Sequence, residues 1–129
     1  MVANQAKLSK KQAITLVNKK FPLHLNTSNT KFSNINKNKP VWWFLFSNYE
    51  FNNDIHLLLN DHIRKVLYYF FIKSGSIKDP EKIFRQRNDE SRTNTSHIEI
   101  NMEDRNFADI LEKRFRFKEY LKGEIEYGK

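Results

Sequence analysis

The chain has 129 residues, of which 39% are hydrophobic and 14% aromatic, so it is long and apolar enough to fold as one domain around its own core. It contains no cysteine, which excludes disulfides, thiolate nucleophiles and sulfur-ligated metal sites. Its formal net charge of +8 predicts an attraction to polyanions.

The apolar runs of the chain are short. The longest, at residues 41–46 and 66–72, fall far below the roughly 20 residues of a membrane-spanning helix, and no apolar signal-peptide region follows the first lysines. We therefore expect a cytoplasmic protein without a membrane partner. The 15 asparagines and 16 lysines are typical of an AT-rich genome, which favours a bacterial, phage or mobile-element origin.

The positive charge is concentrated at one end of the sequence. Residues 1–49 contain eight lysines and no Asp or Glu, whereas the remaining 80 residues hold 15 Lys and Arg against 15 Asp and Glu. The net charge therefore belongs entirely to the first 49 residues. A solvated, solubilising face would explain the lysines alone, but a codon bias that favours Lys also favours Asp and Glu, and these are missing here.

Residues 9–21 have the pattern of an amphipathic helix. Ser9 is a favourable N-cap with Gln12 three residues later, and Ala13, Ile14 and Val17 share one face. Pro22 ends the pattern. The helix should bury its apolar face on the domain and expose lysines to water.

Residues 24–39 are rich in Asn, Ser, Thr and Lys, which predicts loops around a short strand at 32–36. The sequence Lys-Asn-Lys-Pro at 37–40 then predicts a hairpin turn. Three apolar, β-branched and aromatic runs follow at 41–46, 55–59 and 66–72, separated by short polar breaks. Connections this short predict an antiparallel meander, because parallel crossovers need a dozen or more residues. The first and third runs are apolar on both faces, so both sides of the sheet must be covered, or one side must bind something.

Residues 73–96 form a long polar segment. Asp79, Pro80 and Glu81 have the pattern of a helix start, which predicts a short helix to about residue 87. Loops of this length are often functional, and this one carries Arg85 and Arg87.

The C-terminal third is ambiguous. Residues 97–101 alternate as in a strand. Residues 107–121 fit either one helix or a strand at 107–111 followed by a helix at 113–122 that ends at Gly123, and we favour the second interpretation. The fold class is therefore α+β, with an antiparallel sheet of five or six strands, the N-terminal helix on one face and a C-terminal helix or extension.

Catalytic patterns are weak. The chain has neither a glycine-rich phosphate loop nor a nucleophile elbow. Asp54 and His56 share a face of one predicted strand, and His97 and Glu99 share a face of another, so two strands could bring Asp54 and Glu99 together. This outline resembles the PD-(D/E)XK nucleases, which hold Mg²⁺ with carboxylates, but Asn101 stands where that motif has lysine. We expect neither a catalytic or metal site nor a cofactor.

Aromatic residues offer a second kind of surface. Trp43 and Tyr69 could stack unpaired bases on a sheet face flanked by lysines, although such rings more often belong to a core or a dimer interface.

The leading hypothesis is a non-enzymatic module that binds DNA or RNA, in a restriction, phage or mobile-element system. The alternatives are a small protein-binding inhibitor that uses its basic face, and a metal-dependent nuclease. The predicted nucleic-acid contacts are the cationic side chains Lys10, Lys11, Lys19, Lys20, Lys31, Lys37, Lys39, Arg85 and Arg87.

Overall fold

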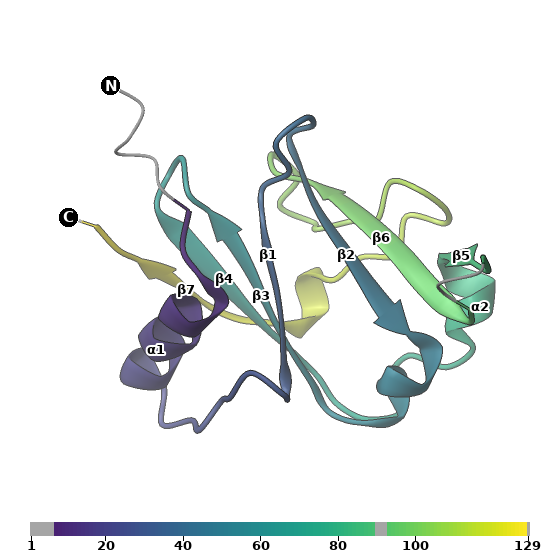
Figure 1. Cartoon of the computed structure of the whole chain (residues 1–129), viewed down its shortest axis with the longest axis horizontal. Helices are drawn as coiled ribbons and strands as arrows, with labels where there is room; N and C mark the ends of the chain where they lie inside the picture. The colour runs from purple at the N-terminus through teal and green to yellow at the C-terminus, as the bar shows by residue number, and fades with distance from the viewer. Residues whose placement is uncertain (1–6, 90–92, 129) are drawn as a thin grey trace.

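The computed structural model describes residues 7–89 and 93–128, which form two β-sheets and a covering helix (Figure 1). The elements in chain order are α1 (Lys10–Lys20), β1 (Thr30–Asn34), β2 (Val41–Ser47), the 3-10 helix η2 (Asn48–Asn52), β3 (Ile55–Asp61), β4 (Val66–Ile72), α2 (Pro80–Ile83), β5 (Arg85–Arg87), β6 (Thr95–Asn101), the 3-10 helix η3 (Lys118–Tyr120) and β7 (Leu121–Glu126). The α+β class is confirmed, and none of the helices in the described ranges has the length and apolar character needed to cross a bilayer.

The strands divide between two sheets, so the expectation of a single meander is wrong. One sheet has the order β1-β3-β4-β7 and the other has the order β2-β6-β5. In the first sheet β3 pairs antiparallel with β4 and β4 with β7, whereas β1 runs parallel to β3. The parallel pair is possible because β2, which belongs to the other sheet, lies between β1 and β3 in the sequence and supplies the long crossover.

The two sheets and α1 form three layers. Figure 1 shows α1 on the left, the four-stranded sheet in the middle and β2, β6 and β5 on the right. One cluster of buried residues joins α1 to the four-stranded sheet and includes Ala13, Val17 and Tyr69. A larger cluster fills the space between the two sheets and includes Trp42 and Phe70. The four-stranded sheet is therefore covered on both faces.

The N-terminal helix forms as its sequence predicts. The Ser9 hydroxyl accepts a hydrogen bond from the Gln12 backbone N–H, and the Gln12 side chain accepts one from the Ser9 backbone, which is a complete capping box. The helix ends at Lys20, and the Phe21 ring then lies over Gly123 of β7, where a Cβ atom would be only 2.5 Å from the ring. Gly123 is thus a site of close approach within a strand and does not end a helix.

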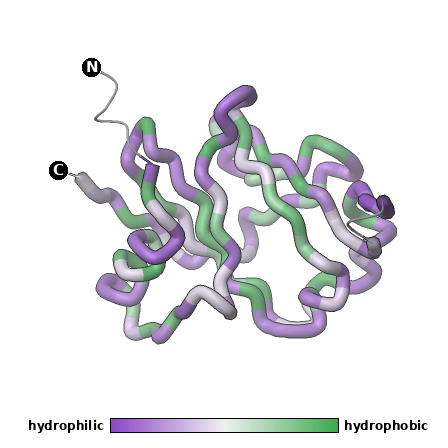
Figure 2. The backbone as a smooth tube through the Cα atoms, viewed as in Figure 1, coloured by the Kyte–Doolittle hydropathy of each residue, from purple (hydrophilic) through white to green (hydrophobic). Residues whose placement is uncertain are grey.

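The turn predicted at residues 37–40 is present between β1 and β2, although β1 lies at Thr30–Asn34 and not at 32–36. Beside this turn an isolated bridge joins Ile35 to Trp42, and the Ser33 hydroxyl donates to the Trp43 carbonyl at 3.0 Å. The two strands then diverge into different sheets (Figure 1). In Figure 2 the turn is hydrophilic, whereas the strands that follow it carry the hydrophobic segments of the core.

Two expected helices are replaced by irregular or extended structure. The first ends after four residues at Ile83, and Arg85–Arg87 instead forms β5 at the edge of β6. Within the segment 73–96, residues 90–92 lie outside the described part of the chain.

The strand expected at 107–111 and the helix expected at 113–122 are also absent. Residues 108, 109 and 116 make only isolated bridges, while Phe107 and Phe117 are fully buried between the sheets. Leu121–Glu126 then pairs with β4. The burial of aromatic rings and the pairing along β4 outweigh the local helical pattern.

Candidate nucleic-acid interface

The cationic side chains predicted to contact nucleic acid lie in four parts of the fold. They are found on α1 (Lys10, Lys11, Lys19, Lys20), on β1 (Lys31), in the β1–β2 turn (Lys37, Lys39) and on β5 (Arg85, Arg87). The acid-free first 49 residues contribute to all three layers, so their lysines do not share one element.

Several of these lysines have hydrogen-bond or ion-pair partners within the protein. The Lys20 ammonium donates to the Glu124 backbone carbonyl at 3.2 Å. The Lys31 ammonium lies 3.5 Å from a Glu50 carboxylate oxygen, and the Lys39 ammonium lies 3.4 Å from Glu99. The number of lysines is therefore larger than the number of ammonium groups that are free of partners within the protein and can contact a ligand.

The outward-pointing side chains of the three-stranded sheet bring another set of residues together. We call this surface the outer sheet face and define it by Trp43, Leu45, Arg85, Arg87, His97 and Glu99. Alternation along the strands places these side chains opposite the core residues, which include Trp42 and Ile98. Trp43 is 37% exposed, although it follows a fully buried tryptophan.

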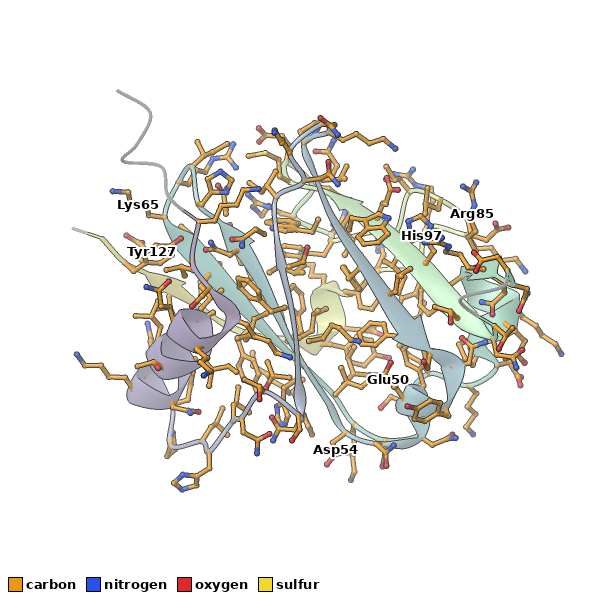
Figure 3. The ribbon with its side chains drawn as sticks, in the orientation of Figure 1. Glu50, Asp54, Lys65, Arg85, His97 and Tyr127 are labelled. Atoms are coloured by element: carbon orange, nitrogen blue, oxygen red, sulfur yellow. The ribbon has the colours of Figure 1, made fainter. Side chains whose placement is uncertain are left out.

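The register of the strands sets the neighbours on this face. Trp43 lies opposite Glu99, and His97 lies between Leu45 on one side and Arg85 on the other. The Trp43 and His97 rings meet edge to face with their centroids 5.3 Å apart. His97 thus holds the indole ring in place, and Figure 3 shows His97 and Arg85 on the neighbouring strands β6 and β5.

Glu99 connects the aromatic pair to the β1–β2 turn. One of its carboxylate oxygens lies 3.3 Å from His97 Nε2, and the other lies 3.4 Å from the Lys39 ammonium. Glu99 is almost fully buried, so its charge requires these cationic or hydrogen-bonding neighbours. Lys39 is thereby anchored at the margin of the outer sheet face.

Burial and neighbouring charges set the pKa of His97. Burial lowers the pKa of His97, Glu99 opposes this effect, and Arg87 and Arg85 add to it. His97 is therefore neutral at pH 7, and the positive charge of this face comes from its arginines. Arg87 also lies 3.3 Å from the Asp89 carboxylate.

The predicted stacking pair separates into two roles. Tyr69 is 4% exposed and packs against Phe21 under α1, so it belongs to the core. Trp43 stays at the surface and is available for stacking. The contact by which His97 supports Trp43 was not predicted from the sequence, although the alternation at 97–101 places the His97 ring on the polar side of that strand.

The carboxylate pair that a metal-dependent nuclease requires is not assembled. Asp54 precedes β3 and accepts a hydrogen bond from the Ser74 backbone, whereas Glu99 lies in the other sheet and pairs with Lys39. Within residues 7–89 and 93–128, no group of three His, Asp or Glu side chains is arranged to hold a metal ion. His97 and Glu99 do share a face, as predicted, and His97 Nε2 lies 3.3 Å from a Glu99 carboxylate oxygen.

Comparisons with models of known protein families, with curated proteins and with solved structures found no match. The argument for function therefore depends on the geometry of the chain itself.

Proposed function

We propose that this protein binds single-stranded nucleic acid on its outer sheet face and performs no reaction on it. The observation that carries the proposal is Trp43, a large aromatic side chain that is 37% exposed on a sheet face whose edge strand β5 carries two arginines. Proteins that bind unpaired strands combine such aromatic rings, on which bases stack, with cationic groups that contact phosphates.

Each component has a distinct energetic part. Stacking of one base on an aromatic side chain contributes about 1–3 kcal/mol. Lys39 in the β1–β2 turn contacts Glu99, the cross-strand neighbour of Trp43, and Arg85 and Arg87 lie on β5, across β6 from β2. These cationic groups can contact phosphates on either side of a stacked base. Phosphate contacts of this kind give an affinity that depends on salt and little on sequence.

The test is a fluorescence-anisotropy titration of a labelled, 5′-hydroxyl single-stranded oligonucleotide with the full chain. The Trp43→Ala substitution should weaken binding roughly 5- to 150-fold, and Trp43→Phe should restore most of the loss because it keeps an aromatic ring. Raising the salt concentration from about 50 to 200 mM should weaken binding of the wild-type chain. A duplex of the same sequence should bind at least tenfold more weakly, because its bases are not free to stack.

A matched pair of charge variants locates the interface. Arg85→Gln and Lys19→Gln each remove one positive charge, from the outer sheet face and from α1 respectively. The proposal predicts a larger loss of affinity and a larger decrease in the salt dependence for Arg85→Gln. Equal effects of the two variants, or equal affinity for duplex and single strand, would show that binding depends on the total charge of the protein. Either result would contradict binding at the outer sheet face.

A further inference from the structure

We infer that a second site, separate from the outer sheet face, binds the terminal phosphate and adjoining nucleoside of a nucleotide. The site lies where β1 and β2 diverge. These strands are bridged at Ile35 and Trp42, and at their opposite ends they belong to different sheets. A cavity of about 420 Å³ occupies this gap, beside the start of α1 and η2, and its volume lies in the range of small-molecule sites.

Two cationic side chains line the cavity. They are Lys10 and Lys31, and the Lys31 ammonium lies 3.5 Å from Glu50 and 5.0 Å from the centre of the Phe46 ring. The Lys10 ammonium donates to the Thr27 carbonyl at 2.6 Å, and no carboxylate in the described part of the chain lies within 4.0 Å of it. Lys31 thus has a carboxylate partner, whereas Lys10 is bound to a neutral carbonyl.

The titration of Lys10 agrees with this charge balance. Burial lowers the pKa of Lys10, the charge of Lys31 lowers it further, and Glu50 only partly opposes them. An anion placed between the two lysines would relieve their repulsion. A compact phosphate dianion suits such a pair better than a neutral group.

The rest of the cavity has a different chemistry. Asp54 lines it, and Tyr49 stands at its rim with 70% of its surface exposed. Figure 3 shows Glu50 and Asp54 near the ends where β1 and β2 have separated. A carboxylate accepts hydrogen bonds from hydroxyl or amino groups, and an exposed tyrosine ring can stack on a flat base.

The lining thus offers one kind of group for each part of a nucleotide: lysines for the phosphate, Asp54 for ribose hydroxyls and Tyr49 for the base. The ligand could be a free mononucleotide or the phosphorylated end of a strand, since both present the same chemistry. The second source rests on the proposed function, because it requires that a strand binds.

The first experiment uses adenosine 5′-monophosphate, adenosine and inorganic phosphate as probes of the full chain, followed by NMR of the backbone amides. The monophosphate should shift amides of residues 27–31 and 53–55 and bind at least tenfold more tightly than either fragment. Lys10→Gln and Lys31→Gln should each weaken it about tenfold, whereas Lys19→Gln, which lies on α1 outside the cavity, should leave it unchanged. Binding that is equal for the monophosphate and phosphate, or insensitive to both lysine variants, would overturn the inference.

The second experiment distinguishes the two sources. A 5′-phosphorylated strand is compared with the same strand carrying a 5′-hydroxyl. If the 5′-phosphate tightens binding of the strand and Lys10→Gln removes only that gain, the strand end is the ligand. If the 5′-phosphate does not change the affinity of the strand while the monophosphate still binds, the free nucleotide is the ligand. Because the monophosphate is measured without any strand, failure of the outer sheet face in the Trp43→Ala test would leave this result intact.

Discussion

The two sheets are built from similar apolar strands, but they differ in what covers them. In the four-stranded sheet, β4 buries Tyr69 against α1 and Phe70 against the other sheet. In the three-stranded sheet, β2 buries Trp42 completely and leaves Trp43 37% exposed. A strand that is apolar on both faces therefore indicates either a central layer, as β4 is here, or a surface that binds something, as proposed for β2.

Buried polar atoms without a hydrogen-bond partner among the described residues occur beside both sheets. The Trp42 indole N–H donates to the Asn60 carbonyl at 2.9 Å, and the Tyr127 hydroxyl donates to the Asn60 side chain at 2.6 Å. His62 Nδ1, in the turn between β3 and β4, has no hydrogen-bond partner in the described part of the chain. Beside the three-stranded sheet, Asp109 Oδ2 also has none there, and His97 Nε2 approaches Glu99 without hydrogen-bond geometry. Unpaired buried atoms therefore do not distinguish the two sheets.

The neighbouring tryptophans give the largest expected difference. Trp42→Ala should lower the free energy of unfolding by about 3–5 kcal/mol, because it empties a fully buried site between the sheets. Trp43→Ala should cost about 1 kcal/mol or less, since its ring is partly exposed and packs on one side only. Urea denaturation of both variants measures the contrast, and similar losses would show that the outer sheet face is part of the core.

A smaller effect is expected where α1 covers the four-stranded sheet. Gly123→Ala places a Cβ atom 2.5 Å from the Phe21 ring, so the ring must move from its contact with Tyr69. We expect a loss of about 1–2 kcal/mol in the free energy of unfolding. Lys122→Ala, the exposed neighbour on β7, is the control. In a Phe21→Leu background the cost of Gly123→Ala should shrink, and an unchanged cost would contradict this account of the contact.

The smallest expected effect concerns Asp109, beside the three-stranded sheet. Burial raises the pKa of Asp109 above its ordinary value of 3.8, although backbone N–H groups that donate to the carboxylate oppose the shift. The folded chain therefore binds this proton more tightly than the unfolded chain, so the stability that Asp109 contributes is present below about pH 4 and is lost as the pH rises through the raised value.

Asp109→Asn removes this ionisation. The free energy of unfolding is measured by urea denaturation from pH 4 to pH 7 for the variant and for the wild type. As the pH rises, the value for the variant should increase relative to that of the wild type, because only the wild type loses stability by ionising Asp109. Glu112→Gln, which replaces an exposed acid nearby, is the control for the loss of a carboxylate. The pKa of His97 is lowered by burial and acts with the opposite sign, and the charge of His97 also lowers the pKa of Asp109, so the variants are compared in a His97→Gln background. A constant difference for Asp109→Asn would contradict the raised pKa.

Local sequence determined much of the fold. The α1 helix was predicted to within a residue, because the capping contacts between Ser9 and Gln12 and the apolar face around Val17 involve residues only a few positions apart. The strands β2, β3 and β4 were predicted for a similar reason, as each is a short β-branched and aromatic run between polar breaks. For the candidate site, the sequence identified Trp43 and the two arginines of β5 as separate features.

Only the tertiary structure decided how these pieces combine. The parallel pairing of β1 with β3 and the separation of β2 into a second sheet depend on contacts between residues some 20 or more positions apart, which leave no periodic pattern in the chain. The same long-range pairing placed residues 121 and 122, the end of the expected helix, in β7, and it placed Arg85 beside His97. The tertiary structure also decided which of the two adjacent tryptophans is buried. Alternation along β2 places their side chains on opposite faces, but it does not determine which face packs against the other sheet.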